Sequence, residues 1–179
     1  MNTDTNHEEA CRDLSTWTIE HLQAFATDAR GQELEAVRVA AQAHAYRSDQ
    51  PLETRRQWAK LSLLANERMH GDGPADRVRE ANQNFMLRMW IIDQLGPDSK
   101  DPDWSPETLA SDTLGALALA PSEAGALASQ WRELAIEQIR ELRWHKILTA
   151  HLDRLVNHLR PGPTRDQLLG WTETRRLLP

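Results

Sequence analysis

The spacing of apolar residues along the chain predicts a protein built almost entirely from helices. Apolar side chains recur at intervals of three and four residues, which places them on one face of a helix that turns by about 100° per residue. In the first such segment the shared face holds Ile19, Leu22, Phe25, Ala26 and Ala29. Beyond Gly31 the apolar face turns to Leu34, Val37, Ala40, Ala41 and His44. We therefore expect two helices separated by a break at Gly31, the first capped by Ser15 or Thr18.

Prolines and glycines divide the rest of the chain into further helices. We expect a helix from the Ser48 or Asp49 cap to just before Gly71, and another from 74 to 95. A third is opened by Ser105 and Pro106, and a fourth is opened by Pro121 and continues to about Arg160. A closing helix begins at Thr164 to Gln167, which have the spacing of a capping box. We expect Leu64 and Trp131 to face the core.

The predicted fold class is an all-α, single-domain bundle of about six to eight helices. A chain of 179 residues fits one domain, and β-branched residues are scarce. Residues 1–14 show no helical periodicity and are polar and acidic, so we expect a flexible leader there and the helical domain over 15–179.

Composition changes this picture mainly by what it excludes. Cys11 is the single cysteine, so no internal disulfide or thiolate zinc site can form. The amino terminus lacks the basic and then apolar layout of a signal peptide, and no run of 18 apolar residues exists, so we expect no membrane span and a cytoplasmic location. The abundance of Ala, Arg and Trp favours a bacterial origin.

The net charge of −6 conceals segments of opposite sign. Residues 1–35 and 72–139 are net acidic, whereas 36–71 and 140–179 are net basic. Helices of opposite sign that pack beside one another would give this pattern, as would a local basic surface on an acidic protein.

The segment "FMLRMWII", residues 85–92, is apolar on nearly all sides. A helix of this kind is buried on two faces, either at the centre of a bundle or between subunits. Arg88 lies at the edge of the apolar face, where it needs Asp93 or a carboxylate of another helix as a partner. Aromatic residues beyond those that fill one core are enriched at protein interfaces. We therefore predict an interaction surface that contains Arg88, Trp90, Ile91 and Trp104.

Two Glu/His pairs offer an alternative, metal-dependent function. Glu67 and His70 have the Glu-x-x-His spacing that is similar to one half of a carboxylate di-iron site, while Glu141 and His145 are four residues apart. The sequence holds one good copy of the motif, and Glu67 falls on the polar face of its helix. His145 is more simply a residue at the wall of the core, as is His44. We expect no cofactor.

The basic end of the chain offers a second alternative, nucleic-acid binding. The candidate contacts are Arg143, Arg154 and Arg160, and Trp144 and Trp171 are interleaved with the basic residues of this region. Arg143 and Arg154 point outward together on the predicted helix. Trp144 points inward, however, which separates the basic side chains from an aromatic ring on which a base could stack.

The sequence contains no nucleophile motif and no phosphate-binding loop. The function that it favours is therefore a non-catalytic cytosolic interaction or assembly module, either a small subunit or adaptor of a larger complex or a homo-oligomer. Binding to nucleic acid and a di-iron-like enzyme are the alternatives.

Overall fold

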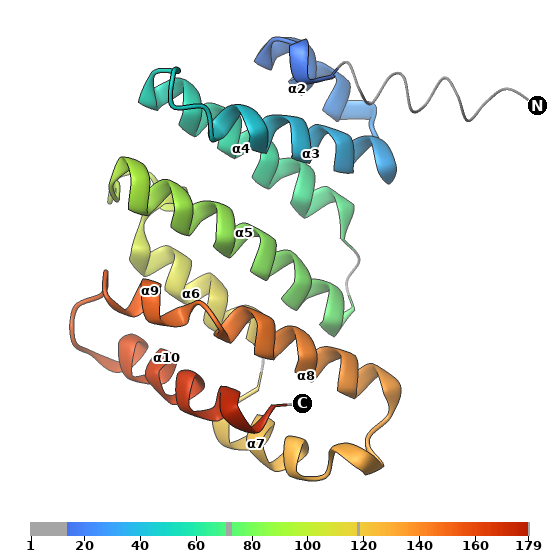
Figure 1. Ribbon diagram of the computed structural model, residues 1–179, viewed down its shortest axis with the longest axis vertical. Coiled ribbons are helices and arrows are strands. Elements are labelled where there is room, and N and C mark those ends of the chain that lie inside the picture. Colours follow the sequence, from blue (N-terminus) through green and yellow to red (C-terminus); the bar gives the residue numbers. More distant parts are fainter. Residues whose placement is uncertain (1–13, 71–72, 118, 179) are drawn as a thin grey trace, which may run out of the picture. The chain divides into compact units, whose positions relative to one another are not determined.

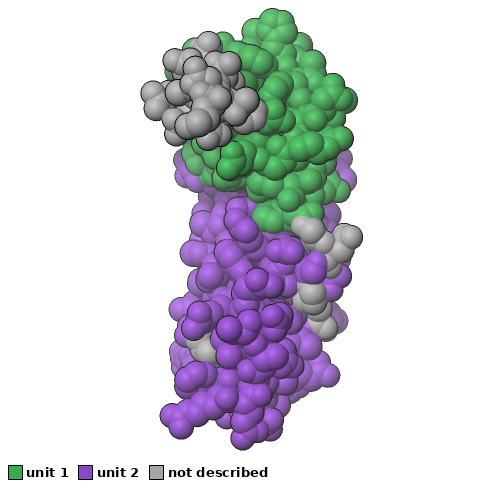
Figure 2. Space-filling model, turned by 90° about the vertical axis from the view of Figure 1, so that its right-hand side faces the viewer, with its two compact units in different colours: residues 1–70 green, residues 71–179 purple. Residues whose placement is uncertain are grey.

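The computed structural model describes residues 14–70, 73–117 and 119–178, whose regular secondary structure consists of helices, with no strand among them. The described residues form eight helices of nine residues or more and one short segment, α9. The all-α prediction is confirmed. The chain divides into two compact units, residues 1–70 and 71–179 (Figure 2). That 15–179 fold as a single domain stays a prediction, and the predicted leader lies almost wholly outside the described residues.

The described part of unit 1, residues 14–70, has three helices, α2 (Ile19–Asp28), α3 (Gln32–Ala45) and α4 (Leu52–Met69), after a 3₁₀ turn, η1 (Leu14–Thr16). The side chain of Thr18 caps α2 by accepting a hydrogen bond from the backbone N–H of His21 at 3.4 Å. Gly31 separates α2 from α3 with a φ of +49°, a conformation that costs a residue with a side chain about 1–2 kcal/mol. The predicted break is thus confirmed.

The core of unit 1 lies between α3 and α4, which run side by side (Figure 1). All five residues of the predicted α3 face are buried. On α4, Trp58, Leu61 and Ala65 are buried as predicted, whereas Leu64 is 47% exposed. The buried face of α4 is therefore narrower than the apolar pattern of the sequence predicts. The predicted Ser48 or Asp49 cap is also wrong, because Pro51 occupies the N-cap position.

Unit 2 is built on α5 (Pro74–Leu95), which packs against α6 (Pro106–Leu117) and α8 (Ile136–Thr149). The other helices are α7 (Pro121–Ser129), α9 (Leu152–Val156) and α10 (Pro163–Thr174). Four of these helices begin at a proline, where the missing N–H costs nothing because the first turn has no internal acceptor. The core gathers Phe85, Met89, Leu142, Leu148 and Trp171 among others.

The predicted continuous helix from Pro121 to Arg160 is wrong. It is interrupted by a 3₁₀ turn, η3 (Trp131–Glu133), and α8 begins only at Ile136, where the Gln138 side chain accepts from the Ala135 N–H at 3.0 Å. No glycine or proline marks this break. Its consequence is that Trp131 is 48% exposed instead of facing the core.

The carboxyl-terminal region differs from prediction in two further ways. First, α8 ends at Thr149 instead of continuing to Arg160. The Thr149 hydroxyl donates to the His145 carbonyl there at 2.7 Å, a contact of the kind that bends helices. Gly162, not Thr164, is the N-cap of α10, so the predicted capping box is absent. A final 3₁₀ turn, η4 (Arg175–Leu177), follows α10. None of the helices in the described ranges combines the length and the apolar composition that a membrane span requires.

Candidate interaction surface

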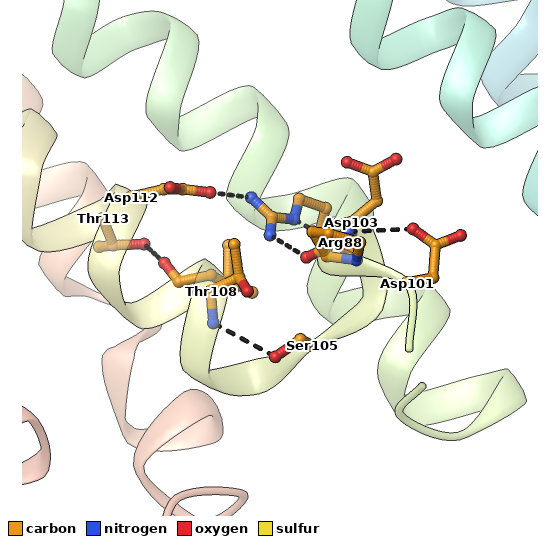
Figure 3. Close-up of polar contacts among 9 residues, drawn as sticks. Arg88, Asp101, Asp103, Ser105, Thr108, Asp112 and Thr113 are labelled. Carbon is orange, nitrogen blue, oxygen red and sulfur yellow. Dashed lines mark hydrogen bonds and ion pairs between the residues drawn. The ribbon is translucent and has the colours of Figure 1, made fainter. Parts of the chain in front are cut away.

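Arg88 is a buried structural residue of unit 2, with an exposed fraction of 6%. Its Nε donates to the carbonyl oxygen of Asp103 at 2.8 Å, and Nη2 donates to that of Pro102 at 2.9 Å. Nη1 pairs with the Asp112 carboxylate at 2.6 Å (Figure 3). The partner is thus a carboxylate of another helix, as one of the two sequence alternatives held, and not Asp93. The guanidinium joins α5 to the connector before α6 and is not available to a binding partner.

The rest of the predicted interaction surface is also largely internal. Trp104 and Ile91 have exposed fractions of 0%, and Trp90 is partly buried. Trp104 belongs to a 3₁₀ turn, η2 (Pro102–Trp104), whose carbonyls are held by Arg88 (Figure 3). The indole of Trp104 is thus enclosed at the connector that Arg88 holds. The four residues therefore do not form an exposed patch.

Three of the four residues of the metal alternative are exposed or engaged in other contacts, and the fourth, Glu141, is partly buried. Glu67 is exposed on α4, and the His70 ring lies 3.2 Å from the Asn66 side-chain oxygen. His145 is fully buried, and its Nδ1 lies 2.8 Å from the Glu141 backbone oxygen. Its Nε2 contacts the carbonyl of Leu117, so neither ring nitrogen is open to a metal. In the part of the chain that the structure describes, no group of three or more His, Cys, Asp or Glu side chains is arranged to hold a metal ion.

The three arginines of the nucleic-acid alternative differ from one another. Arg154 of α9 pairs with Asp93, which also lies 3.0 Å from His158. Burial alone would raise the pKa of the Asp93 carboxyl, but the hydrogen bonds from Arg154 and His158 outweigh it and lower that pKa. Arg160 is exposed beside a pocket of about 360 Å³ that Glu107 also lines. A carboxylate in that pocket repels phosphate.

Arg143 belongs to an exposed row of side chains along α8 (orange in Figure 1). The row consists of Ile136, Arg140, Arg143 and Ile147, which we call the α8 outer face. At about 100° per residue these four positions fall within about 60° of one another on the helix. Ile136 is 75% exposed and Ile147 is 43% exposed, and both arginines are exposed. The opposite side of α8 carries the buried Leu142, His145 and Leu148.

The two arginines of the α8 outer face are unpaired. Neither guanidinium has a hydrogen bond or an ion pair with any residue of the ranges 14–70, 73–117 and 119–178. By contrast, Lys146 of the same helix donates to the carbonyl of Leu178 at 2.8 Å. Two unpaired arginines thus lie between two exposed isoleucines on one helix face of a protein whose net charge is −6.

A second exposed apolar residue stands just before α8. Trp131 is 48% exposed, and the Arg132 guanidinium lies 5.6 Å from its ring centroid. Trp131 lies in η3, at the connection that leads into the α8 outer face. Tryptophan and arginine are the residue types that most often dominate protein interfaces.

This surface is not among the sequence predictions, because the predicted helix continues from Pro121 through Trp131. The signal was present in the helical periodicity, since Ile136, Arg140, Arg143 and Ile147 fall opposite the apolar stripe of Leu148 and Leu152. An outward isoleucine at each end of a basic stripe is the feature that could have been found.

Comparisons with known proteins add no assignment. No protein-family model matches the chain, and no curated protein or solved structure matches it either.

Proposed function

We propose that this protein is a non-catalytic interaction module of the cytoplasm, acting as a small subunit or adaptor through the α8 outer face. The observation that carries the proposal is the exposure of Ile136 and Ile147 on either side of two unpaired arginines. The surface predicted from the sequence around Arg88 is not part of it, because that arginine holds the fold of unit 2 together.

The energetics of this face suit a contact of moderate affinity. Burying a fully exposed isoleucine side chain yields about 1.5–3 kcal/mol, and the two isoleucines here are three-quarters and two-fifths exposed. Arginine adds planar, bidentate hydrogen bonding to carboxylates. α8 has 14 residues, which at 1.5 Å per residue is a contact length of about 20 Å. A single helix face of this size supports a transient or multi-point interaction.

The two buried histidines, a residue type that often takes part in catalysis, have structural roles in this protein. His44 stacks on Trp58 with ring centroids 4.2 Å apart, and its Nε2 lies 2.8 Å from the Ser15 carbonyl. His145 contacts two carbonyls, as described above. Both rings serve as packing and hydrogen-bonding elements of their cores, which favours the non-catalytic function.

Site-specific photo-crosslinking in the native host tests the proposal. A benzophenone amino acid at Ile136 or Ile147 should give a protein adduct of defined mass, visible on a denaturing gel. The matched control is the same amino acid at Gln57, an exposed position of α4, which should give no adduct of that mass. A chain that is monomeric in native mass spectrometry and yields no adduct from Ile136 or Ile147 would contradict the proposal.

A further inference from the structure

We propose that the α8 outer face binds an acidic amphipathic helix of a partner protein. This inference rests on the proposed function and adds the chemistry of the partner. In the complex, carboxylates of the partner pair with Arg140 and Arg143, and its apolar side chains cover Ile136 and Ile147.

The spacing of the face fits a helix of three to four turns. Ile136 and Ile147 are eleven residues apart, which corresponds to about 16 Å along the axis of α8. The arginines lie between them, about 6 Å and 10 Å from the Ile136 end. Two helices that pack at a shallow crossing angle stay in contact over this length. The complementary helix therefore carries apolar residues about eleven positions apart and Asp or Glu between them.

The charge of the face argues for an acidic partner. The chain as a whole has a net charge of −6, yet none of the described carboxylates engages either of these two cations. Arginine and carboxylate form charge-assisted, often bidentate hydrogen bonds. A partner that supplies carboxylates at these two positions gains attraction there, whereas a basic partner meets repulsion.

The two isoleucines favour a protein helix over nucleic acid. A phosphate backbone would pair with Arg140 and Arg143 but would leave Ile136 and Ile147 against charged oxygens, without burial. An amphipathic helix covers the apolar ends and pairs the basic centre at the same time. In this mode of recognition, the apolar side chains on one face of the partner helix make the main contacts.

A display selection on the full chain tests the chemistry of the partner. The probe is a library of 18-residue helices with randomised outward positions, selected separately on the wild type and on the R140E/R143E double variant. The wild type should enrich helices with Asp or Glu at the centre and apolar residues toward both ends. The double variant should enrich helices with Lys or Arg at the centre.

Anisotropy titrations then measure the effect with one enriched acidic peptide. Its affinity should fall about tenfold or more for R140E/R143E, because two attractive charge pairs become repulsive. The same peptide with lysines in place of its central carboxylates should recover binding to that variant. The matched control is R160E/R165E, which makes the same change in net charge elsewhere in unit 2, and its affinity should stay within about twofold. Circular dichroism verifies that both variants are folded.

Three outcomes would overturn the inference. The wild type enriches no acidic helix, the enriched peptide binds R140E/R143E equally well, or a 20-base-pair DNA duplex competes for the face while acidic helices do not. The proposed function fails separately, when Ile136 and Ile147 give no crosslink. A crosslinked partner that persists unchanged in R140E/R143E retains the function and removes the acidic helix.

Discussion

The imidazole of His145 lies against the indole of Trp171, with ring centroids 5.5 Å apart and 23° between the ring planes. The two residues come from α8 and α10, and both are buried in the core of unit 2. Through its ring nitrogens His145 also reaches its own helix at Glu141 and the end of α6 at Leu117. One side chain therefore joins three helices.

Replacing His145 by phenylalanine should separate the stacking from the hydrogen bonds. The ring against Trp171 is kept, whereas both contacts to carbonyl oxygens are lost. A carbonyl oxygen can only accept hydrogen bonds, and the Leu117 carbonyl still accepts one from the backbone N–H of Leu119 after the histidine is replaced. We expect the free energy of unfolding to fall by about 1–3 kcal/mol, measured by urea denaturation with tryptophan fluorescence. His21→Phe, on the exposed side of α2, should change it by less than about 0.5 kcal/mol. Equal effects of the two substitutions would show that the carbonyl contacts contribute nothing.

The contacts of Arg88 predict that substitution of Arg88 lowers the free energy of unfolding more than substitution of its ion-pair partner Asp112 does. Arg88→Met removes three hydrogen bonds from a side chain that is 8% exposed, and should lower the free energy of unfolding by about 2–4 kcal/mol. Asp112→Asn keeps an acceptor, and the side chain is 56% exposed, so we expect a loss of about 1 kcal/mol or less. Urea denaturation of both variants measures the difference. An Asp112→Asn effect as large as that of Arg88→Met would place the stabilisation in the ion pair instead of the connector carbonyls.

Most of the helices could be predicted from the sequence because their ends carry local signals. Gly31 and the prolines that open α5, α6 and α7 act within one or two residues, so no tertiary information is needed to place them. The break at η3 has no such signal. Because no local signal marks this break, the apolar periodicity alone predicts Trp131 in the core and Ile136 in the middle of a longer helix.

The candidate site was harder to predict than the fold, because burial depends on residues that are distant in the chain. Arg88 and Trp104 lie 16 positions apart, and only the folded connector shows that they belong to one internal cluster. Ile136 and Ile147, by contrast, are ordinary residues of an amphipathic helix until the structure shows that nothing in the described ranges covers them.

The ion pair of Asp93 predicts a dependence of stability on pH. Although burial opposes it, hydrogen bonding by Arg154 and His158 lowers the pKa of Asp93 in the folded protein. A lowered folded pKa means that the unfolded chain takes up the proton first as the pH falls. The stabilisation by Asp93 is therefore complete above about pH 5 and is lost as the pH falls from about 4 through the lowered pKa.

Comparison of Asp93→Asn with the wild type measures this contribution. The difference in free energy of unfolding should be about 0.5–1 kcal/mol near pH 7, the range for partly exposed pairs, and should shrink below about pH 4. Glu173→Gln, at an exposed position of α10, should show a smaller difference with no such pH profile. A difference for Asp93→Asn that stays constant down to about pH 2 would contradict the role of the carboxylate charge.

Two glycines should respond in opposite directions to replacement by alanine. Gly31 has a φ of +49° and open space around it, so Gly31→Ala should lower the free energy of unfolding by about 1–2 kcal/mol through backbone strain alone. Gly115 lies within α6, has helical geometry and likewise has open space at its Cβ position. Gly115→Ala should therefore raise the free energy of unfolding by about 0.5–1 kcal/mol, since alanine restricts the unfolded chain and favours helix. Thermal denaturation of both variants gives the two signs, and a stabilising Gly31→Ala would mean that the turn between α2 and α3 does not need a left-handed residue.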